Sequence, residues 1–211
     1  IAICGDIMIV LTGASGFIGS VILAQLNSAG ATNITVVDDL GKGTKFKNLN
    51  GKLFIDMISP MEIPDTSEEP IEAIIHAGAN SNTLGSDWMN DYYLPNIADT
   101  RKWFDMAESC GVPFIFLSSA AVKGNGDGPT SQYGASKLYA ETVIKNRSKT
   151  FDPIILRPFN VYGPNESHKG EMASIIYQWY REYTDTGRIT LFEGSEKYSR
   201  DFVFVEDVAK A

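Results

Sequence analysis

A tyrosine and a lysine lie four positions apart in the segment Tyr133-Gly134-Ala135-Ser136-Lys137. On a helix, this spacing puts a phenol and an ammonium on the same face, one turn apart. A free phenol has a pKa of about 10, so it needs a neighbouring positive charge to act as a base near neutral pH. The segment therefore predicts an acid/base centre in which Tyr133 moves the proton and the charge of Lys137 lowers the tyrosine pKa.

Two serines, Ser118 and Ser119, come directly after the apolar run Phe114–Leu117. A short apolar run of this kind predicts a buried strand, and ligands of a parallel sheet bind beyond the carboxyl ends of its strands. A hydroxyl at this point can orient a reacting oxygen. Because a Tyr-x-x-x-Lys pattern occurs by chance in many helices, the prediction of a catalytic centre also depends on the other signals along the chain.

Three glycines, Gly13, Gly16 and Gly19, follow the apolar run Met8–Leu11 and precede a helical pattern. Glycines let the backbone approach a pyrophosphate, and the amino end of the helix supplies free amide groups and a favourable dipole. A glycine triplet alone is a weak signal, but here the strand before it and the helix after it supply the context that the motif requires. The triplet therefore predicts a dinucleotide cofactor, and Lys137 could hold its nicotinamide ribose.

The apolar run Ile34–Val37 is followed by Asp38 and Asp39. An acid at the end of the second strand normally accepts hydrogen bonds from the hydroxyls of the adenosine ribose, so Asp38 is the predicted ribose residue. Two adjacent acids repel the 2′-phosphate of NADP, whereas Lys42 and Lys45 can neutralise it. These residues leave the choice between NAD and NADP open.

The elements that position these residues alternate along the chain. Five apolar runs are predicted to be buried strands, and three longer stretches have helical periodicity. The strands are expected at Met8–Leu11, Ile34–Val37, Ile74–Ile75, Phe114–Leu117 and Ile154–Leu156, and the helices at Ser20–Ser28, about Asn96–Ser109 and Lys137–Ser148. The repeated order of strand, helix, strand predicts the α/β class with a doubly wound parallel sheet, the Rossmann architecture.

The pattern changes after Pro158, where we expect a partial, truncated substrate-binding lobe. A helix is predicted around Met172–Tyr183 and a short strand near Leu191–Phe192. The stretch Arg200–Val205 is expected to lead into another helix.

The chain is therefore divided into a dinucleotide-binding Rossmann domain at 8–165 and the start of a substrate-binding domain at 166–211. The segment Ile1–Ile7 is expected to be extra sequence before a natural start at Met8. The sequence stops inside a helical pattern that has no stop signal, so we expect the remainder of the second domain to be missing.

Composition excludes several classes of partner. A formal net charge of −8 opposes binding to a nucleic-acid backbone, which needs clustered Lys and Arg. No apolar run reaches the roughly 18 residues that a membrane helix needs, so no membrane partner is expected. The two cysteines, Cys4 and Cys110, lack metal-ligand spacing and are expected to be buried thiols, which suits a cytoplasmic protein without a metal site.

The glycine triplet, Asp38, the serines after the strand and the tyrosine–lysine pair resemble, in this order, the extended short-chain dehydrogenase/reductase family of NAD-dependent epimerases and dehydratases. The resemblance extends from Met8 to Ala211. Further motifs resemble the ADP-L-glycero-D-manno-heptose 6-epimerases of that family, and the Gly-Thr-Lys-Phe and His-Lys-Gly elements are the most specific. These motifs are Asp38-Asp39-Leu40, Gly43-Thr44-Lys45-Phe46, Phe159-Asn160-Val161-Tyr162-Gly163-Pro164, His168-Lys169-Gly170, Met172-Ala173-Ser174, Phe192-Glu193-Gly194-Ser195 and Arg200-Asp201-Phe202-Val203.

The resemblance implies an epimerase that oxidises C6″ of a nucleotide-activated heptose to a carbonyl and then reduces it from the other face. It implies Tyr133 and Lys169 as two acid/bases on opposite sides of the sugar, assisted by Ser119 and Lys137. Two faces call for two proton donors. A lysine needs a depressed pKa to act as a base, which burial beside Lys137 or the cofactor would produce.

The resemblance also implies two sets of binding residues. The cofactor, NADP with NAD as the alternative, would be bound by Gly13, Gly16, Phe17, Ile18, Gly19, Asp38, Asp39, Lys45, Ala77, Gly78, Ala79, Asn80, Ser81, Asn96, Tyr133, Lys137, Val161 and Lys169. The nucleotide sugar, with ADP-heptose as the expected partner, would be bound by Ser119, Asn160, Phe192, Glu193, Gly194, Ser195 and Arg200, whose guanidinium can grip a diphosphate in bidentate fashion. The full-length protein is expected to form homo-oligomers.

Three other functions stay open. A 4-epimerase or a 4,6-dehydratase of nucleotide sugars would share the fold, although Ala120 and Ala121 stand where the dehydratase uses a titrating Asp-Glu pair. A non-catalytic cofactor-binding protein typically loses the tyrosine or the lysine of the pair, and both are present here. Fold resemblance by itself does not decide between these functions, because function depends on the site.

Overall fold

The computed structural model describes residues 8–41, 43–66 and 69–211. Three features named from the sequence lie outside these residues: the segment Ile1–Ile7, Cys4 within it, and Lys42. None of the helices in the described part of the chain is long and apolar enough to cross a membrane.

A six-stranded parallel sheet in the order β3-β2-β1-β4-β5-β6 forms the centre of the molecule. The strands are β1 (Met8–Thr12), β2 (Ile34–Val37), β3 (Asp56–Ile58), β4 (Ile71–His76), β5 (Phe114–Leu117) and β6 (Ile154–Leu156). All five predicted strands are confirmed, and the strand order is that of the Rossmann fold. The order reverses between β1 and β4, so their carboxyl ends open the crevice in which ligands of this fold bind.

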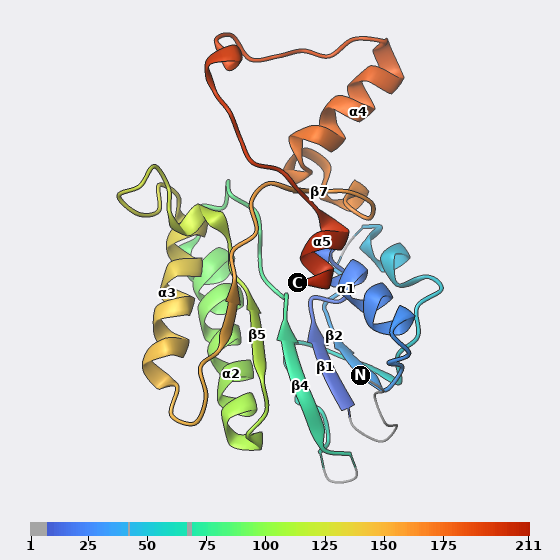
Figure 1. Cartoon of the computed structure of the whole chain (residues 1–211), viewed down its shortest axis with the longest axis vertical. Helices are drawn as coiled ribbons and strands as arrows, with labels where there is room; N and C mark the ends of the chain where they lie inside the picture. Colours follow the sequence, from blue (N-terminus) through green and yellow to red (C-terminus); the bar gives the residue numbers. More distant parts are fainter. Residues whose placement is uncertain (1–7, 42, 67–68) are drawn as a thin grey trace.

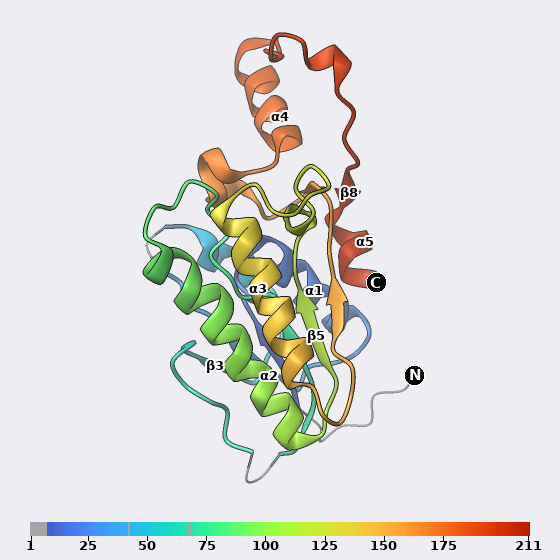
Figure 2. The ribbon, with the colours of Figure 1, turned by 90° about the vertical axis from the view of Figure 1, so that its left-hand side faces the viewer.

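Helices cover both faces of the sheet, giving three layers (Figure 1). One face is covered by α1 (Phe17–Ser28), with α5 (Val205–Lys210) packed beside it. The other face carries α2 (Asp99–Cys110) and α3 (Gln132–Arg147), as the turned view also shows (Figure 2). The core under α2 and α3 is aromatic, with Trp103, Phe104, Phe114 and Phe116 fully buried, whereas the core under α1 is aliphatic.

The helix expected at about Asn96–Ser109 begins earlier and has two parts. It starts as a wide π-helix, η2 (Trp88–Ala98), and continues directly into α2. Pro95 lies inside the wide part, where its missing N–H cannot complete a regular α-helical ladder. The helix expected at Lys137–Ser148 also begins earlier, at Gln132, because Ser131 caps it by accepting a hydrogen bond from the Gly134 N–H at 3.1 Å.

Most of the chain between β6 and α5 forms a smaller unit beyond the sheet, at the top of both ribbon views (Figures 1 and 2). Two short strands, β7 (Val161–Tyr162) and β8 (Val203–Phe204), pair in parallel, and α4 (Ile175–Thr186) projects away from the sheet. Short 3₁₀ helices complete the fold, namely η1 (Lys45–Leu49), η3 (Ala120–Val122), η4 (Ser167–Met172) and η5 (Ser195–Lys197).

Two predictions from the sequence are wrong. No strand forms at Leu191–Phe192, where both side chains are exposed and no neighbouring strand supplies hydrogen-bond partners. Cys110 is exposed rather than buried, because it is the last residue of α2 and the buried positions of this helix are Thr100, Trp103, Phe104 and Ala107. Within the described ranges, no group of three or more His, Cys, Asp or Glu side chains is arranged to hold a metal ion.

Candidate active site

The glycine triplet forms a close-packed turn between β1 and α1. Gly13 has a φ of +69°, and a Cβ there would lie 2.6 Å from the backbone nitrogen of Gly78. A Cβ at Gly19 would lie 2.1 Å from the Gly13 carbonyl oxygen. Gly16 caps α1 without a side-chain hydrogen bond, so the amino end of the helix stays open toward the carboxyl edge of the sheet. This turn has the shape that a phosphate cradle requires.

We expect Gly19→Ala to be among the more damaging single substitutions in the cofactor domain. The added methyl group would overlap backbone, which cannot move aside as a flexible side chain can. Overpacking typically costs about 1 to 3 kcal/mol of unfolding free energy, and a clash with backbone puts this substitution at the upper end of that range. Urea unfolding would measure the loss, with Gly16→Ala as the control, because its Cβ would meet the Gly13 oxygen at 3.1 Å and require a much smaller shift. Equal stability of both variants would contradict the prediction.

Asp38 directly follows β2 and is buried against the same turn. One carboxylate oxygen accepts a hydrogen bond from the Ser15 N–H at 2.8 Å, and the other pairs with the Lys45 ammonium at 2.7 Å. Asp39, by contrast, is exposed and accepts a hydrogen bond from the Gly41 N–H within its own loop at 2.8 Å. Asp38 and Lys45 therefore form one charged unit beside the glycine turn, and Asp39 lies outside it.

A cavity of about 540 Å³ opens along the carboxyl edge of the sheet, above the glycine turn. Most residues of the predicted cofactor and catalytic sets line it, together with Asn160 of the predicted substrate set. They are Gly13, Gly16, Phe17, Ile18, Gly19, Lys45, Ala77, Ala79, Asn80, Ser81, Ser119, Tyr133, Lys137, Asn160, Val161 and Lys169. Segments that are far apart in the sequence thus meet around one cavity, as expected at the switch point of a doubly wound sheet.

Tyr133 lies in the first turn of α3 and faces this cavity. Its hydroxyl forms a hydrogen bond with Ser119, the residue that caps η3. Burial raises the pKa of Tyr133 above its ordinary value of 10.0, and the hydrogen bond with Ser119 acts in the opposite direction. The sequence predicted that the charge of Lys137 would lower this pKa, but it is not among the groups that shift it.

Lys137 lies one turn further along α3 and is almost completely buried. Its ammonium donates a hydrogen bond to the Leu117 carbonyl oxygen at 2.8 Å and lies 4.7 Å from the centre of the Phe116 ring. Burial lowers the pKa of Lys137 from 10.5 to about 7, although the negative charge of Glu141 opposes the shift. An amine with a pKa near neutrality exchanges protons readily at physiological pH, which suits an acid/base site.

Lys169 reaches the cavity from η4, a different element from the α3 helix that carries Tyr133 and Lys137. Its ammonium lies 5.8 Å from the centre of the Phe17 ring. Burial lowers the pKa of Lys169 below its ordinary value of 10.5, and the negative charge of Glu166 opposes this. The predicted direction of the shift is therefore present without a contribution from Lys137.

The buried carboxylate of Glu166 closes the loop that carries Lys169. It accepts hydrogen bonds from the Gly163 N–H at 3.0 Å, the Ser174 N–H at 2.6 Å and the Ser174 hydroxyl at 2.9 Å. A carboxylate held by three donors stabilises the conformation of the segment between them. Glu166 thus fixes the loop from which Lys169 points into the cavity.

Two predicted cofactor residues act from behind the cavity wall. Asn96 is fully buried on η2, and its side chain both accepts from the Asn80 N–H at 2.8 Å and donates to the Asn80 carbonyl at 3.0 Å. The same amide donates to the Ser136 hydroxyl at 3.0 Å, which links the Asn80 loop to α3. Gly78 packs against Gly13 and donates its N–H to the Thr12 hydroxyl at 3.0 Å.

Five residues of the predicted substrate set are not brought to the cavity. They follow α4 in the exposed segment that leads to β8: Phe192, Glu193, Gly194, Ser195 and Arg200. Asn160 connects the two regions, because it lines the cavity while its amide donates to the Asp201 carbonyl at 2.7 Å. The structure thus groups Ser119 and Asn160 with the catalytic residues and leaves the other five apart.

The sequence did not predict an ion-pair network behind the serines. Glu141 of α3 is buried and accepts hydrogen bonds from the Ser118 hydroxyl at 2.6 Å and the Arg157 Nε at 2.8 Å, with a second contact from the same guanidinium. Other unpredicted cavity residues include His168 and Met172. His168 stands beside Lys169 in the His-Lys-Gly motif, and that adjacency was the available signal for it.

Glu141→Gln is expected to destabilise the fold by about 1 kcal/mol at pH 7, because the buried carboxylate is lost to Ser118 and to the partly exposed Arg157. Burial raises the pKa of Glu141, but hydrogen bonds from Arg157 and Ser118 outweigh it and lower the pKa below 4.5. The unfolded chain therefore binds the proton first, and this stabilisation is present above pH 4.5 and lost as the pH falls below it.

Urea unfolding at pH 7 and pH 4 would test this, and the glutamine variant should depend less on pH than the parent protein. Lys145→Met is the control, since Lys145 is exposed and lies 3.7 Å from the same carboxylate. An unchanged pH dependence after removal of Glu141 would rule out the proposed ion-pair contribution.

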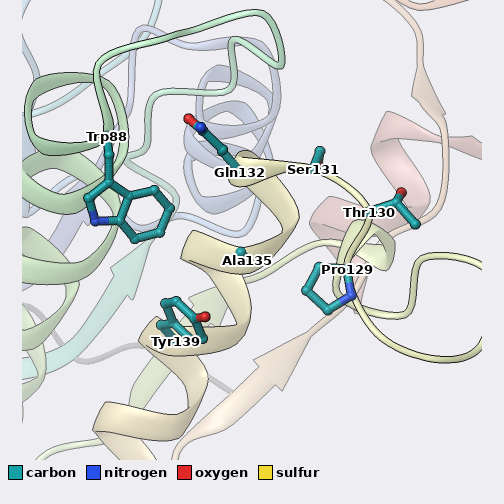
Figure 3. Close-up of a pocket in the computed structure, with 7 residues that line it drawn as sticks. All are labelled: Trp88, Pro129, Thr130, Ser131, Gln132, Ala135 and Tyr139. Atoms are coloured by element: carbon teal, nitrogen blue, oxygen red, sulfur yellow. The ribbon is translucent and has the colours of Figure 1, made fainter.

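A second hollow, of about 640 Å³, lies between η2 and α3 on the outer side of the molecule (Figure 3). Trp88 faces Ala135 and Tyr139 across it. The rings of Trp88 and Tyr139 are arranged edge to face, with their centroids 6.0 Å apart. The rest of its lining is Pro129, Thr130, Ser131 and Gln132. This lining contains no charged side chain and no predicted site residue, whereas all four predicted catalytic residues line the cavity at the sheet edge.

Comparison with known proteins agrees with this geometry. The ADP-L-glycero-D-manno-heptose-6-epimerase of Thiobacillus denitrificans is 37% identical over 224 residues, covering 95% of this chain and 67% of that protein. The crystal structure of the Helicobacter pylori enzyme of the same name superposes with a TM-score of 0.82 at 26% identity, covering 97% of this chain and 70% of that one.

A UDP-N-acetylglucosamine 4-epimerase from Methanobrevibacter ruminantium superposes almost equally well, with a TM-score of 0.81 at 26% identity over 97% of this chain and 71% of that one. Residues 9–211, from β1 to the last residue of the sequence, match the sequence model of the NAD dependent epimerase/dehydratase family. With its Rossmann sheet, its glycine cradle and its tyrosine–lysine pair, the chain belongs to the NAD dependent epimerase/dehydratase family.

Proposed function

We propose that the protein is a nucleotide-sugar epimerase that oxidises one sugar carbon transiently and reduces it again with inverted configuration. The observation that carries this proposal is that Tyr133 and Lys169 line one cavity and come from two separate elements, α3 and η4. A simple dehydrogenase needs one acid/base, whereas inversion requires proton transfer on two faces of the reacting carbon. A non-catalytic cofactor-binding protein would need neither group.

The cradle suits a dinucleotide, because side chains at Gly13 or Gly19 would fill the turn where a pyrophosphate must approach. The bound nicotinamide would supply the hydride acceptor and donor. Lys137 would hold the nicotinamide ribose, and Asp38 would hold the adenosine ribose. Ser119 would orient the sugar oxygen whose proton Tyr133 removes or returns, since the two hydroxyls are already hydrogen-bonded.

We propose NADP as the preferred cofactor, with NAD as the alternative. Lys45 pairs with the Asp38 carboxylate, so the lysine charge offsets the negative charge that would repel a 2′-phosphate. Lys45 lines the cavity, and its ammonium would attract a 2′-phosphate bound there. Relative affinities for NADP and NAD, measured with the parent protein and Lys45→Met, would test this choice.

For the substrate we propose ADP-D-glycero-D-manno-heptose, with inversion at C6″. The His-Lys-Gly motif supplies Lys169, and the heptose epimerase compared above resembles this chain along nearly its whole length. A 4,6-dehydratase is disfavoured because Ala120 and Ala121 form η3 directly after Ser119, and their methyl groups cannot titrate. We further propose residues 8–165 as the cofactor domain, 166–211 as the beginning of the substrate domain, and a cytoplasmic homo-oligomer as the working form.

The direct test incubates the purified protein with ADP-D-glycero-D-manno-heptose and follows the configuration at C6″ by proton NMR. Conversion to the L-glycero epimer would establish both the substrate and the reaction. No conversion, with cofactor shown to be bound, would refute the heptose assignment. In that case a nucleotide-sugar 4-epimerase becomes the second candidate, favoured by the nearly equal superposition on such an enzyme.

A further inference from the structure

One ring nitrogen of His168, Nε2, has no hydrogen-bond partner among the residues that the structure describes. Its Nδ1 lies 3.0 Å from the Asn165 carbonyl oxygen and 3.3 Å from the amide nitrogen of Asn48. Both hydrogens of that amide are already used, because it donates to the Ser15 and Asn165 carbonyls at 3.0 Å each. Nδ1 must therefore carry the proton that goes to Asn165, and Nε2 is left without a bond.

The backbone around His168 is fixed, so this orientation is built into the loop. Asn165 has a φ of +74°, and its side chain donates to the Ser20 hydroxyl of α1 at 3.0 Å. Asn48 ties the same loop to Ser15 in the glycine turn. The ring of His168 is thus held against the cofactor cradle by contacts from α1 and η1.

The surroundings of His168 are cationic. It lines the same cavity as Lys45 and Lys169, and both ammonium groups interact with it electrostatically. The nearby carboxylate of Asp38 is already bound by Ser15 and Lys45. A partner for the free nitrogen in this position has to tolerate two positive charges, which points to an anionic ligand rather than a neutral one.

We propose that His168 is a cofactor-binding residue whose Nε2 donates a hydrogen bond to a phosphate group of the dinucleotide. The phosphate is either the diphosphate bridge beside the glycine turn or the 2′-phosphate beside Lys45. The inference rests on the proposed cofactor binding and extends it to a residue outside the predicted set.

The bond requires His168 to take up a proton, because Nδ1 already donates to Asn165. Burial lowers the pKa of His168 below 6.5, and the charges of Lys169 and Lys45 lower it further, while the Asn165 carbonyl and Asp38 act in the opposite direction. The imidazole is therefore mainly neutral in the free protein at pH 7. A negatively charged phosphate beside Nε2 would favour the charged form, so cofactor binding should be coupled to proton uptake.

Two substitutions of His168 distinguish the contribution of Nδ1 from that of Nε2. In His168→Asn, the side-chain amide can replace the Nδ1 donor to Asn165 but leaves nothing at the position of Nε2. In His168→Gln, the longer amide can reach the position of Nε2 while giving up the Nδ1 bond. Isothermal titration of the purified protein with oxidised NADP and oxidised NAD, at pH 6 and pH 8, provides the measurement without catalysis.

We expect the asparagine variant to bind about tenfold more weakly, as loss of a charge-assisted hydrogen bond predicts, and the glutamine variant to stay within about threefold of the parent protein. Binding to the parent protein should be tighter at pH 6 than at pH 8. Both variants should reduce this difference to the part that comes from Lys137, which lines the same cavity and has a pKa of about 7. Weakening for NADP alone would place Nε2 at the 2′-phosphate, and equal weakening for both cofactors would place it at the diphosphate.

The inference would be overturned if the asparagine variant bound both cofactors as tightly as the parent protein. Strong loss in the glutamine variant with retention in the asparagine variant would also overturn it, because His168 would then serve only to support Asn165. If the parent protein bound neither cofactor, the proposed function itself would fall. The two failures are therefore distinguishable in one set of titrations.

Discussion

Tyr133→Phe is expected to reduce the rate of epimerisation by about 10²- to 10⁴-fold, the range for loss of a general acid/base. The substitution removes one hydroxyl and keeps the ring, so the packing of the first turn of α3 should survive. The partner left behind, Ser119, is only partly buried and also caps η3 through the Ala121 N–H at 3.1 Å, so it is not stranded. The loss should therefore appear in kcat, with cofactor affinity and unfolding free energy nearly unchanged.

Tyr139→Phe provides the matched control for this experiment. Tyr139 lies on the same helix and loses the same hydroxyl, but it is exposed and lines the outer hollow with Trp88. Its variant should keep full activity. Comparable losses in both variants would show that the effect comes from α3 as a whole, and would remove Tyr133 from its proposed role.

The pattern of apolar residues predicted the sheet well because a parallel sheet is covered on both faces. β1, β2 and β5 are therefore nearly continuous apolar runs, which predict a strand even though apolar and polar residues do not alternate in them. β3 escaped prediction because it has three residues at the edge of the sheet, begins with Asp56 and is partly exposed. At Leu191–Phe192, by contrast, a strand was predicted but does not form, because these apolar residues have no strand beside them.

The same distinction applies to the site. Motifs contained in one turn, such as the glycine triplet and the pair Tyr133 and Lys137, could be interpreted from local spacing, because one helix or one turn fixes their geometry. The contacts that orient them could not. Ser118 and Glu141 are 23 positions apart, and His168 and Asn48 are 120 apart, so their meeting depends on how the strands are ordered in the sheet.

The pKa values of Tyr133 and Lys137 could not be predicted from their spacing. The spacing of Tyr133 and Lys137 suggested that the ammonium lowers the tyrosine pKa, but the lysine amine bonds to the Leu117 carbonyl and lies against Phe116. Burial then dominates both groups, raising one pKa and lowering the other. Helical spacing gives the face on which two side chains lie, whereas the depth of that face below the surface depends on the whole fold.

The second large effect is expected for Lys169→Met, which should also lower the rate of epimerisation by about 10²- to 10⁴-fold. Methionine keeps an unbranched apolar stem beside Phe17 but cannot carry a proton. Burial lowers the pKa of Lys169, so more of the amine is unprotonated and able to act as a base as the pH rises through that lowered value. Lys123→Met is the control, because Lys123 also lies 5.8 Å from the centre of a phenylalanine ring, that of Phe159, but is exposed.

Tyr133→Phe and Lys169→Met can be compared in one experiment, in which each variant is given both epimers of the sugar. If Tyr133 and Lys169 serve opposite faces of the sugar, Tyr133→Phe should block the transient oxidation of one epimer and Lys169→Met that of the other, in single turnovers. A protein with one acid/base would lose both oxidations in the tyrosine variant and neither in the lysine variant. The pattern of losses thus depends on the placement of two proton carriers on α3 and η4, which is the feature that separates inversion from simple oxidation at this site.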